Sequence, residues 1–160
     1  MPATVVFHCP QMAPLAQRIL EEESSLTLGV IDWAEFKDGF PNLFIRDVDI
    51  VDGNDIVFLA SLDTPGDIFR QLAVMSALPW YGARSLKIFL PYFPTGTMDR
   101  ASEPGQIVTA KTLARQLSSV PPCLECKSEI YIFDIHALQE WHYFGDQVGV
   151  RLLSAMPLLQ

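Results

Sequence analysis

Short runs of apolar, often β-branched residues alternate along this chain with segments in which apolar residues recur every three or four positions. The first pattern is typical of buried strands and the second of amphipathic helices, so the alternation predicts an α/β domain with a largely parallel sheet. Strands are expected at 4–8, 30–36, 43–46, 56–60, 85–90 and 129–133. Helices are expected from Pro10 onward, from the cap Thr64 to about Leu78, over 107–117 and briefly over 137–141.

The two strands at 30–36 and 43–46 flank the segment Lys37-Asp38-Gly39, which has the composition of a turn. The pattern therefore predicts a pair of strands joined at that turn. The chain has no internal repeat and no low-complexity segment, and its 160 residues predict one domain.

One polar cluster, Asp134-Ile135-His136, stands where the apolar strand 129–133 ends. Residues two apart on a strand point to the same face, so the carboxylate and the imidazole are expected to converge at the carboxyl end of the sheet. Open α/β sheets place their ligands at that end, and the pair has the chemistry to hold a divalent cation or a phosphate. The alternative is an ordinary aspartate that caps a helix, beside a half-buried histidine.

A second polar segment, 95–100, follows the strand 85–90 and carries Arg100. Its backbone amides and the guanidinium are free to meet an anion. Most loops after strands bind nothing, but two such loops at one edge of a sheet reinforce each other. We therefore expect Arg100, Asp134 and His136 to share a cleft for a metal-bound triphosphate.

Several familiar motifs are absent or incomplete. Neither the phosphate-binding loop ending in Gly-Lys-Ser/Thr nor Gly-x-Gly-x-x-Gly occurs. The spacing of Cys123 and Cys126 fits half of a zinc or redox site, but no second pair follows and no helix is predicted there, which favours an incidental pair. The aspartates between 47 and 55 lack the glycine and glutamate positions of a calcium-binding loop, so they are interpreted as surface carboxylates.

The amino-acid composition excludes several classes of protein. Apolar residues make up 49% of the chain, which excludes disorder, and the longest apolar runs are too short to cross a bilayer. A net charge of −8 without a basic patch argues against nucleic-acid binding. The N-terminus does not resemble a secretory signal and the three cysteines form no disulfide framework, so an intracellular, cytoplasmic location is expected.

Four segments resemble the amino-terminal half of ribose-phosphate diphosphokinase, also called phosphoribosyl pyrophosphate synthetase. Residues 90–94 with Asp99-Arg100 look like the strand and ATP loop of the family, and 109–117 look like its next helix. Residues 133–139 look like its metal-and-ATP histidine motif, and 36–41 like its adenine-contacting hairpin. The match runs in order over essentially the whole chain.

Two further segments, 93–97 and 143–146, are similar to the phosphate-independent, plant-type class of this family. The resemblance implies a three-layer α/β sandwich of the phosphoribosyltransferase type with a β-hairpin flap. It also implies transfer of the β,γ-diphosphoryl group of ATP to ribose 5-phosphate with Mg²⁺, giving phosphoribosyl pyrophosphate and AMP, in a homo-oligomer. By this resemblance the ATP-binding residues are Phe36, Asp38, Thr97, Met98, Asp99, Arg100 and His136, and the metal ligands are Asp134, His136 and Asp146.

In the family, Phe36 and Asp38 would contact the adenine from a neighbouring subunit. The ribose-5-phosphate loop and the mobile basic loop belong to a second domain, and no residue here matches either of them. We therefore expect these 160 residues to show no turnover alone. A non-catalytic regulatory subunit is the alternative. A metal-dependent phosphatase ranks last, because His8-Cys9-Pro10 stands where its acidic nucleophile would be.

Overall fold

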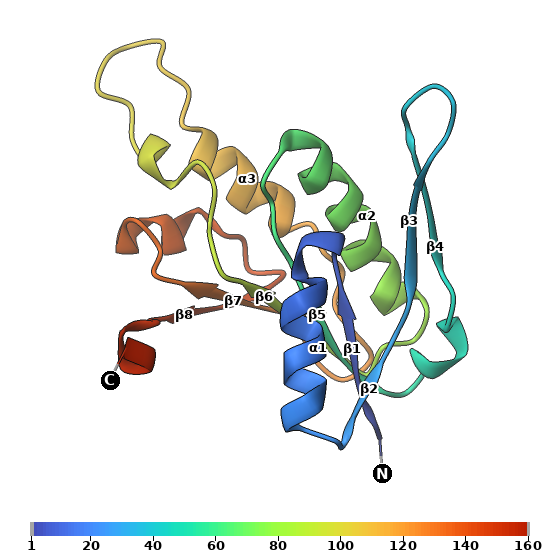
Figure 1. Ribbon diagram of the computed structural model, residues 1–160. Helices are drawn as coiled ribbons and strands as arrows, with labels where there is room; N and C mark the ends of the chain where they lie inside the picture. Colours follow the sequence, from blue (N-terminus) through green and yellow to red (C-terminus); the bar gives the residue numbers. More distant parts are fainter. Residues whose placement is uncertain (1, 160) are drawn as a thin grey trace.

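A six-stranded parallel sheet forms the centre of the molecule, which a computed structural model describes over residues 2–159 (Figure 1). The strand order is β2-β1-β5-β6-β7-β8, and every pair of neighbours is parallel. The strands are β1 (Thr4–His8), β2 (Leu26–Leu28), β5 (Asp55–Leu59), β6 (Ser85–Leu90), β7 (Glu129–Phe133) and β8 (Gly149–Leu153).

Helices cover both faces of this sheet and make three layers. On one face α2 (Pro65–Trp80) and α3 (Thr109–Leu117) pack their apolar sides onto alternate residues of the strands, and this is the larger core. On the other face α1 (Ala13–Glu22) packs Ala16 against Val6 and Leu59. The predicted three-layer α/β sandwich is confirmed.

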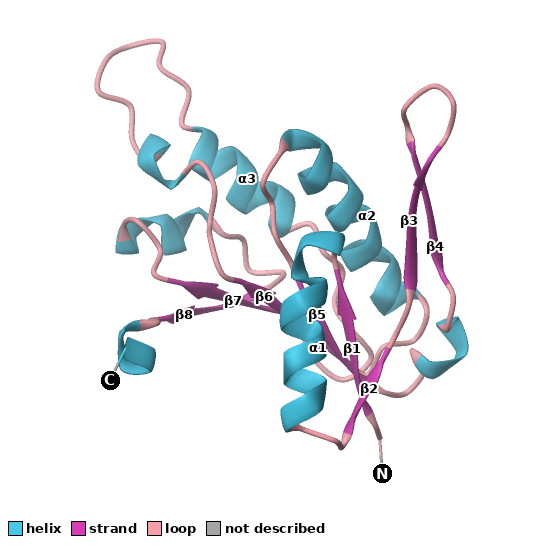
Figure 2. Ribbon diagram, in the orientation of Figure 1, coloured by secondary structure: helices cyan, strands magenta, loops and turns pink. Residues whose placement is uncertain are grey.

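An antiparallel hairpin of β3 (Ile31–Glu35) and β4 (Pro41–Ile45) stands apart from the main sheet (Figure 2). Its inner side chains, Trp33 and Leu43 among them, pack against the core on the face of α2. The predicted pair of strands is therefore present, with bounds shifted by one or two residues. Its tip, which carries the predicted turn, extends away from the body of the molecule (Figure 1).

Most predicted elements agree with the structure, and the differences have local causes. Thr64 caps α2 as expected, because its Oγ1 accepts a hydrogen bond 3.1 Å long from the amide of Asp67. The helix expected from Pro10 begins as a 3₁₀ turn, η1 (Pro10–Met12), before α1. Strands β2 and β8 are missing from the sequence prediction; both lie at the edges of the sheet, where one strand has only three residues and the other carries exposed Arg151.

Short 3₁₀ turns occupy several of the loops. They are η2 (Val48–Ile50), η3 (Gly96–Met98), η4 (Leu138–Tyr143) and η5 (Met156–Leu159). The brief helix expected over 137–141 is η4, which is 3₁₀ rather than α-helical. Within the described residues, no helix is both long and apolar enough to span a membrane.

Candidate functional site

A hollow of about 370 Å³ lies between the loops that follow β6 and β7. These strands are neighbours in a parallel sheet, so their carboxyl ends bring the two loops together. Figure 2 shows η3 and η4 as short helices on these loops. The residues that line the hollow include Thr97, Met98, Asp99 and Arg100 from the first loop and His136 and Gln139 from the second.

Arg100 and His136 are both exposed on this hollow. Neither side chain forms an ion pair or a hydrogen bond with another residue in 2–159. The fold brings both residues to the lining of one hollow, as predicted. A guanidinium and an imidazole that no protein group occupies are suited to hydrogen-bond with an anion such as phosphate.

Asp99 joins the two loops instead of facing a ligand. Its carboxylate is buried and accepts a hydrogen bond from Nε2 of Gln139 at 2.5 Å. The hydroxyl of Tyr143 donates to its backbone carbonyl. Asp99 thus fixes the loop that carries Arg100 relative to η4.

The loop after β6 takes an unusual backbone path as it approaches η4. Thr95 has a φ of 65°, a left-handed conformation that costs free energy in a β-branched residue and that is most often retained at functional sites. At Gly96, a Cβ atom would lie 3.0 Å from Cβ of His136 and 3.5 Å from both carboxylate oxygens of Glu140. A side chain at position 96 would need His136 to shift by a few tenths of an ångström, so glycine eases the close approach of the two loops.

Glu140 lies beside Gly96 of the loop after β6, and no pattern in the sequence predicts a role for it. It is fully buried, and its Oε1 accepts a hydrogen bond 3.1 Å long from the amide of Ala137. Its Oε2 has no partner among the described residues. Burial raises the pKa of Glu140, Asp99 raises it further, and the hydrogen bond from Ala137 and the charge of His136 oppose the shift.

The expected convergence of Asp134 with His136 is wrong. Strand β7 ends at Phe133 and Asp134 has a φ of 43°, so the alternation of a strand no longer governs the two side chains. The Asp134 carboxylate instead accepts hydrogen bonds from Oγ of Ser154 at 2.9 Å and from the amide of Ala155 at 3.1 Å. It therefore holds the chain that leaves β8.

Asp146 also lies away from His136. It lines a different hollow, together with His142 and Lys127, and its backbone carbonyl accepts a hydrogen bond from Nζ of Lys127. Across residues 2–159, no group of three or more His, Cys, Asp or Glu side chains is arranged to hold a metal ion. The three predicted metal ligands are thus not assembled into one site.

Phe36 and Asp38 stand at the tip of the hairpin. Phe36 is 55% exposed, and the Asp38 carboxylate accepts a hydrogen bond 3.2 Å long from the amide of Phe40 within the turn. Neither residue lines the hollow that holds Arg100 and His136. On this chain, the two groups of predicted ATP-binding residues therefore lie in separate places.

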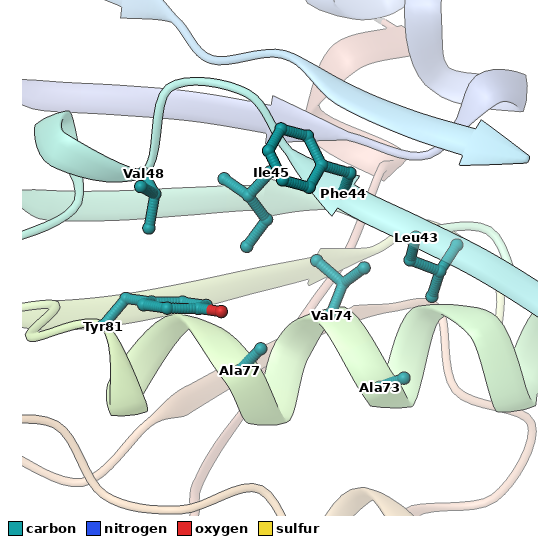
Figure 3. Close-up of a pocket in the computed structure, with 8 residues that line it drawn as sticks. All are labelled: Leu43, Phe44, Ile45, Val48, Ala73, Val74, Ala77 and Tyr81. Carbon is teal, nitrogen blue, oxygen red and sulfur yellow. The ribbon is translucent and has the colours of Figure 1, made fainter.

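A separate hollow of about 290 Å³ lies between the hairpin and α2 (Figure 3). Leu43 and Ile45 point into it from β4, while Val74 and Tyr81 border it on the side of α2 (Figure 3). The Tyr81 hydroxyl is the one polar side-chain group among its lining residues. This lining has no charged group to meet a phosphate, so we place the candidate site at the ends of β6 and β7.

A polar hollow at the carboxyl edge of a parallel sheet is the arrangement of ligand-binding α/β proteins. The family model that describes the N-terminal domain of ribose phosphate pyrophosphokinase matches residues 4–120, so this chain belongs to that family. It is 46% identical over 155 residues to ribose-phosphate pyrophosphokinase 3, mitochondrial, of Spinacia oleracea, covering 97% of this chain and 38% of that protein. It is 42% identical over 154 residues to ribose-phosphate pyrophosphokinase 4 of Oryza sativa, covering 96% of this chain and 47% of that protein.

The fold has a counterpart among solved structures. It is similar to phosphoribosylpyrophosphate synthetase from Mycobacterium smegmatis, with a TM-score of 0.82 at 21% identity, over 98% of this chain and 50% of that one. This likeness confirms the α/β fold with its mostly parallel sheet. The chain spans less than half the length of the curated relatives described above.

Proposed function

We propose that this chain is the nucleotide-binding half of a ribose-phosphate pyrophosphokinase and holds the phosphates of ATP in the hollow between the loops after β6 and β7. The observation that carries the proposal is that Arg100 and His136, from two separate loops, line one hollow without an ion pair to any described residue. Buried charges pair with one another, whereas charges that face a ligand are left open.

The reaction places specific demands on such a half-site. Transfer of the diphosphoryl group spreads negative charge over phosphate oxygens, and a protein accelerates it mainly by fixed donors aimed at that charge. Arg100 supplies a planar set of donors and His136 supplies one more from the facing loop. Asp99 and Gln139 act as positioning residues, because their hydrogen bond fixes the distance between the two loops.

Mg²⁺ enters this proposal with the ATP and not as an ion that the chain holds by itself. The carboxylates of Asp134 and Asp99 are both engaged by protein donors, and Asp146 lines another hollow. Mg²⁺ commonly keeps several waters and binds through substrate phosphates, which is consistent with a site of this kind. We therefore derive no step through a metal bound to this chain.

The complete reaction would make phosphoribosyl pyrophosphate and AMP from ATP and ribose 5-phosphate. No residue here matches the ribose-5-phosphate loop, so we propose that a second domain or subunit supplies it and that these 160 residues alone do not turn over. Phe36 and Asp38, which the family resemblance predicts to contact adenine, are exposed at the hairpin tip, and this supports assembly of copies of the chain around a shared nucleotide.

We also assign the chain to the plant-type, phosphate-independent class. The support is the gradient of identity, which is 46% and 42% with the spinach and rice proteins and 26% with the pyrophosphokinase of Fusobacterium nucleatum. One observation favours a second function, a regulatory subunit without catalysis: the predicted metal ligands are not assembled in this chain.

Isothermal titration of the full chain with ATP and Mg²⁺ separates these two functions. We expect measurable binding that His136→Ala weakens at least about tenfold, because each charge-assisted hydrogen bond to phosphate contributes roughly 1.5–3 kcal/mol. The matched control is His142→Ala, since His142 is exposed on η4 but lines the other hollow. Arg100→Ala is expected to weaken binding to a similar extent.

Two results would contradict the proposal. The first is the absence of any heat of binding for the unsubstituted chain, which would favour the regulatory function. The second is equal affinity in the His136→Ala and His142→Ala variants, which would place the nucleotide elsewhere.

A further inference from the structure

Cys123 and Cys126 lie in the loop that joins α3 to β7, beside the amino ends of β5 and β6 (Figure 1). The amide of Cys123 donates to the carbonyl of Cys126 at 2.9 Å, across a turn of Leu124 and Glu125. Adding the N–Cα, Cα–C and C=O bond lengths to this distance puts the two Cα atoms at most about 7 Å apart. Disulfides form when the Cα atoms are about 4.4–6.8 Å apart, so this turn brings the cysteines within or very near bonding range.

The turn is held in place from outside. The amides of Leu124 and Glu125 each donate a 3.2 Å hydrogen bond, to the carbonyls of Ala83 and Arg84 respectively. Nη1 of Arg84 also contacts Oε2 of Glu125 at 2.9 Å. These contacts fix the turn against the start of β6. The fold therefore already orders the backbone between the two cysteines, which lowers the entropic cost of joining their thiols.

The two thiols differ in access. Cys126 is exposed and lines an open hollow of about 380 Å³, in which Arg84 is paired with Asp55 and Glu125. Cys123 is half-buried, with its Sγ 3.7 Å from Oγ of Ser128. Burial raises the pKa of the Cys123 thiol, its contact with Ser128 opposes this, and a charge on Cys126 raises it further. An external reagent therefore reaches Cys126 first.

We propose that Cys123 and Cys126 form a reversible dithiol–disulfide pair that is oxidised by a low-molecular-weight disulfide. The Cys126 thiolate attacks one sulfur of that disulfide, which forms a mixed disulfide and releases one small thiol. Cys123 then gives up its proton and attacks Sγ of Cys126, which releases the second small thiol and closes the protein disulfide. Two electrons pass from the protein to the reagent, and the two protons lost by the cysteines end on the two released thiols.

The geometry changes the interpretation that the spacing alone favoured. From sequence the pair is incidental, because no helix follows it as in thioredoxin-type proteins and no second pair completes a zinc site. The hydrogen bond from Cys123 to Cys126 provides the proximity that a helix would otherwise give. Within residues 2–159 no third ligand completes a metal site around the pair, so redox exchange is the chemistry the pair supports.

The test is to incubate the reduced, folded chain with oxidised glutathione, trap the free thiols with iodoacetamide and measure intact and peptide masses. We expect the product to lose two hydrogens, with Cys123 and Cys126 protected from alkylation, and reduced glutathione to reverse the change. Cys9 is fully buried and serves as the internal reference, which reacts only after unfolding.

Two single variants complete the test. Cys123→Ser should retain one glutathione on Cys126, because no second thiol remains to expel it, and Cys126→Ser should react much more slowly. The proposal is overturned if the unsubstituted chain also retains glutathione, or if both thiols stay open to alkylation. Neither result depends on nucleotide binding, so this inference and the proposed function are tested independently.

Discussion

Charged side chains at the two edges of the same sheet differ in whether other protein groups pair with them. At the amino edge Arg84 pairs with both Asp55 and Glu125, and Ser85 donates a further hydrogen bond to Asp55. At the carboxyl edge Arg100 and His136 face an open hollow, with no ion pair to a residue in 2–159. Charges that the protein satisfies hold the structure together, whereas charges that it leaves open are available to a ligand.

The carboxylates of the two edges show the same contrast through their pKa values. Burial acts to raise the pKa of Asp55, but hydrogen bonds from Ser85 and Arg84 and the nearby positive charges outweigh it, so the pKa lies below its ordinary value. Burial raises the pKa of Glu140, and the negative charge of Asp99 adds to the rise. The ionised form is thus favoured by the fold at one edge and disfavoured at the other.

The largest effect is expected from Asp55→Asn, which weakens the ion pair with Arg84 and leaves its half-buried partners poorly satisfied. We expect the free energy of unfolding at neutral pH to fall by about 1–2 kcal/mol, in line with hydrogen bonds to charged groups in partly exposed positions. Because the pKa of Asp55 is lowered on folding, its stabilisation is present above the ordinary aspartate pKa and is lost as pH falls through the folded value.

Urea unfolding of this variant across a range of pH values, followed by tryptophan fluorescence, measures this difference. Asp49→Asn is the matched control, because Asp49 is exposed on η2. Affinity for ATP should be unchanged in both variants. A loss of nucleotide binding in Asp55→Asn would contradict the view that the amino edge of the sheet is structural and only the carboxyl edge binds ligand.

A smaller effect of opposite sign is expected from Glu140→Gln. The neutral amide removes the cost of burying a carboxylate whose Oε2 has no protein partner, while the oxygen that remains can still accept from Ala137. The pKa of Glu140 is raised on folding, so the native chain loses stability as pH rises above the ordinary glutamate pKa. The variant should therefore be more stable by up to about 1 kcal/mol at neutral pH, with the gain fading in acid.

The same unfolding series measures this gain, and Glu103→Gln, in the exposed loop before α3, is the control. If Glu140→Gln is less stable than the native chain at neutral pH, then the carboxylate has a partner in solution and is not an unpaired group behind the hollow.

How far the sequence predicts this molecule depends on whether the deciding contacts are local. The strands 85–90 and 129–133 are predicted to the residue, because their apolar runs are bounded by breaks that need no tertiary information. The meeting of Arg100 with His136 also follows, since neighbouring parallel strands end at one edge. The position of Asp134 was predicted wrongly because it has a left-handed backbone and its carboxylate bonds to Ser154 and Ala155, about twenty residues further along the chain.

Glu140 shows a second limit of sequence reasoning. It stands in a segment of mixed polarity, between Gln139 and Trp141, where glutamate is ordinarily exposed. In the fold it is buried with its carboxylate close to Gly96, more than forty residues earlier in the chain. A glycine after a strand, in a loop that also carries an arginine, is the one local signal that could have indicated this contact.

The smallest effect is expected from Asp134→Asn. This variant tests whether Asp134 binds the nucleotide with its metal or only holds the chain after β8. Asparagine tolerates the left-handed backbone and its side-chain oxygen can keep one of the two hydrogen bonds from Ser154 and Ala155. We therefore expect a loss of only about 0.5 kcal/mol in the free energy of unfolding and no more than about a twofold change in affinity for ATP with Mg²⁺. ATP titrations with and without Mg²⁺ separate the two roles, because loss of a metal ligand would weaken only the binding measured with Mg²⁺. A tenfold or greater loss of affinity that occurs only with Mg²⁺ would show that Asp134 turns toward the metal-bound nucleotide when it binds. The Asp134 carboxylate would then belong to the ligand-binding edge of the sheet.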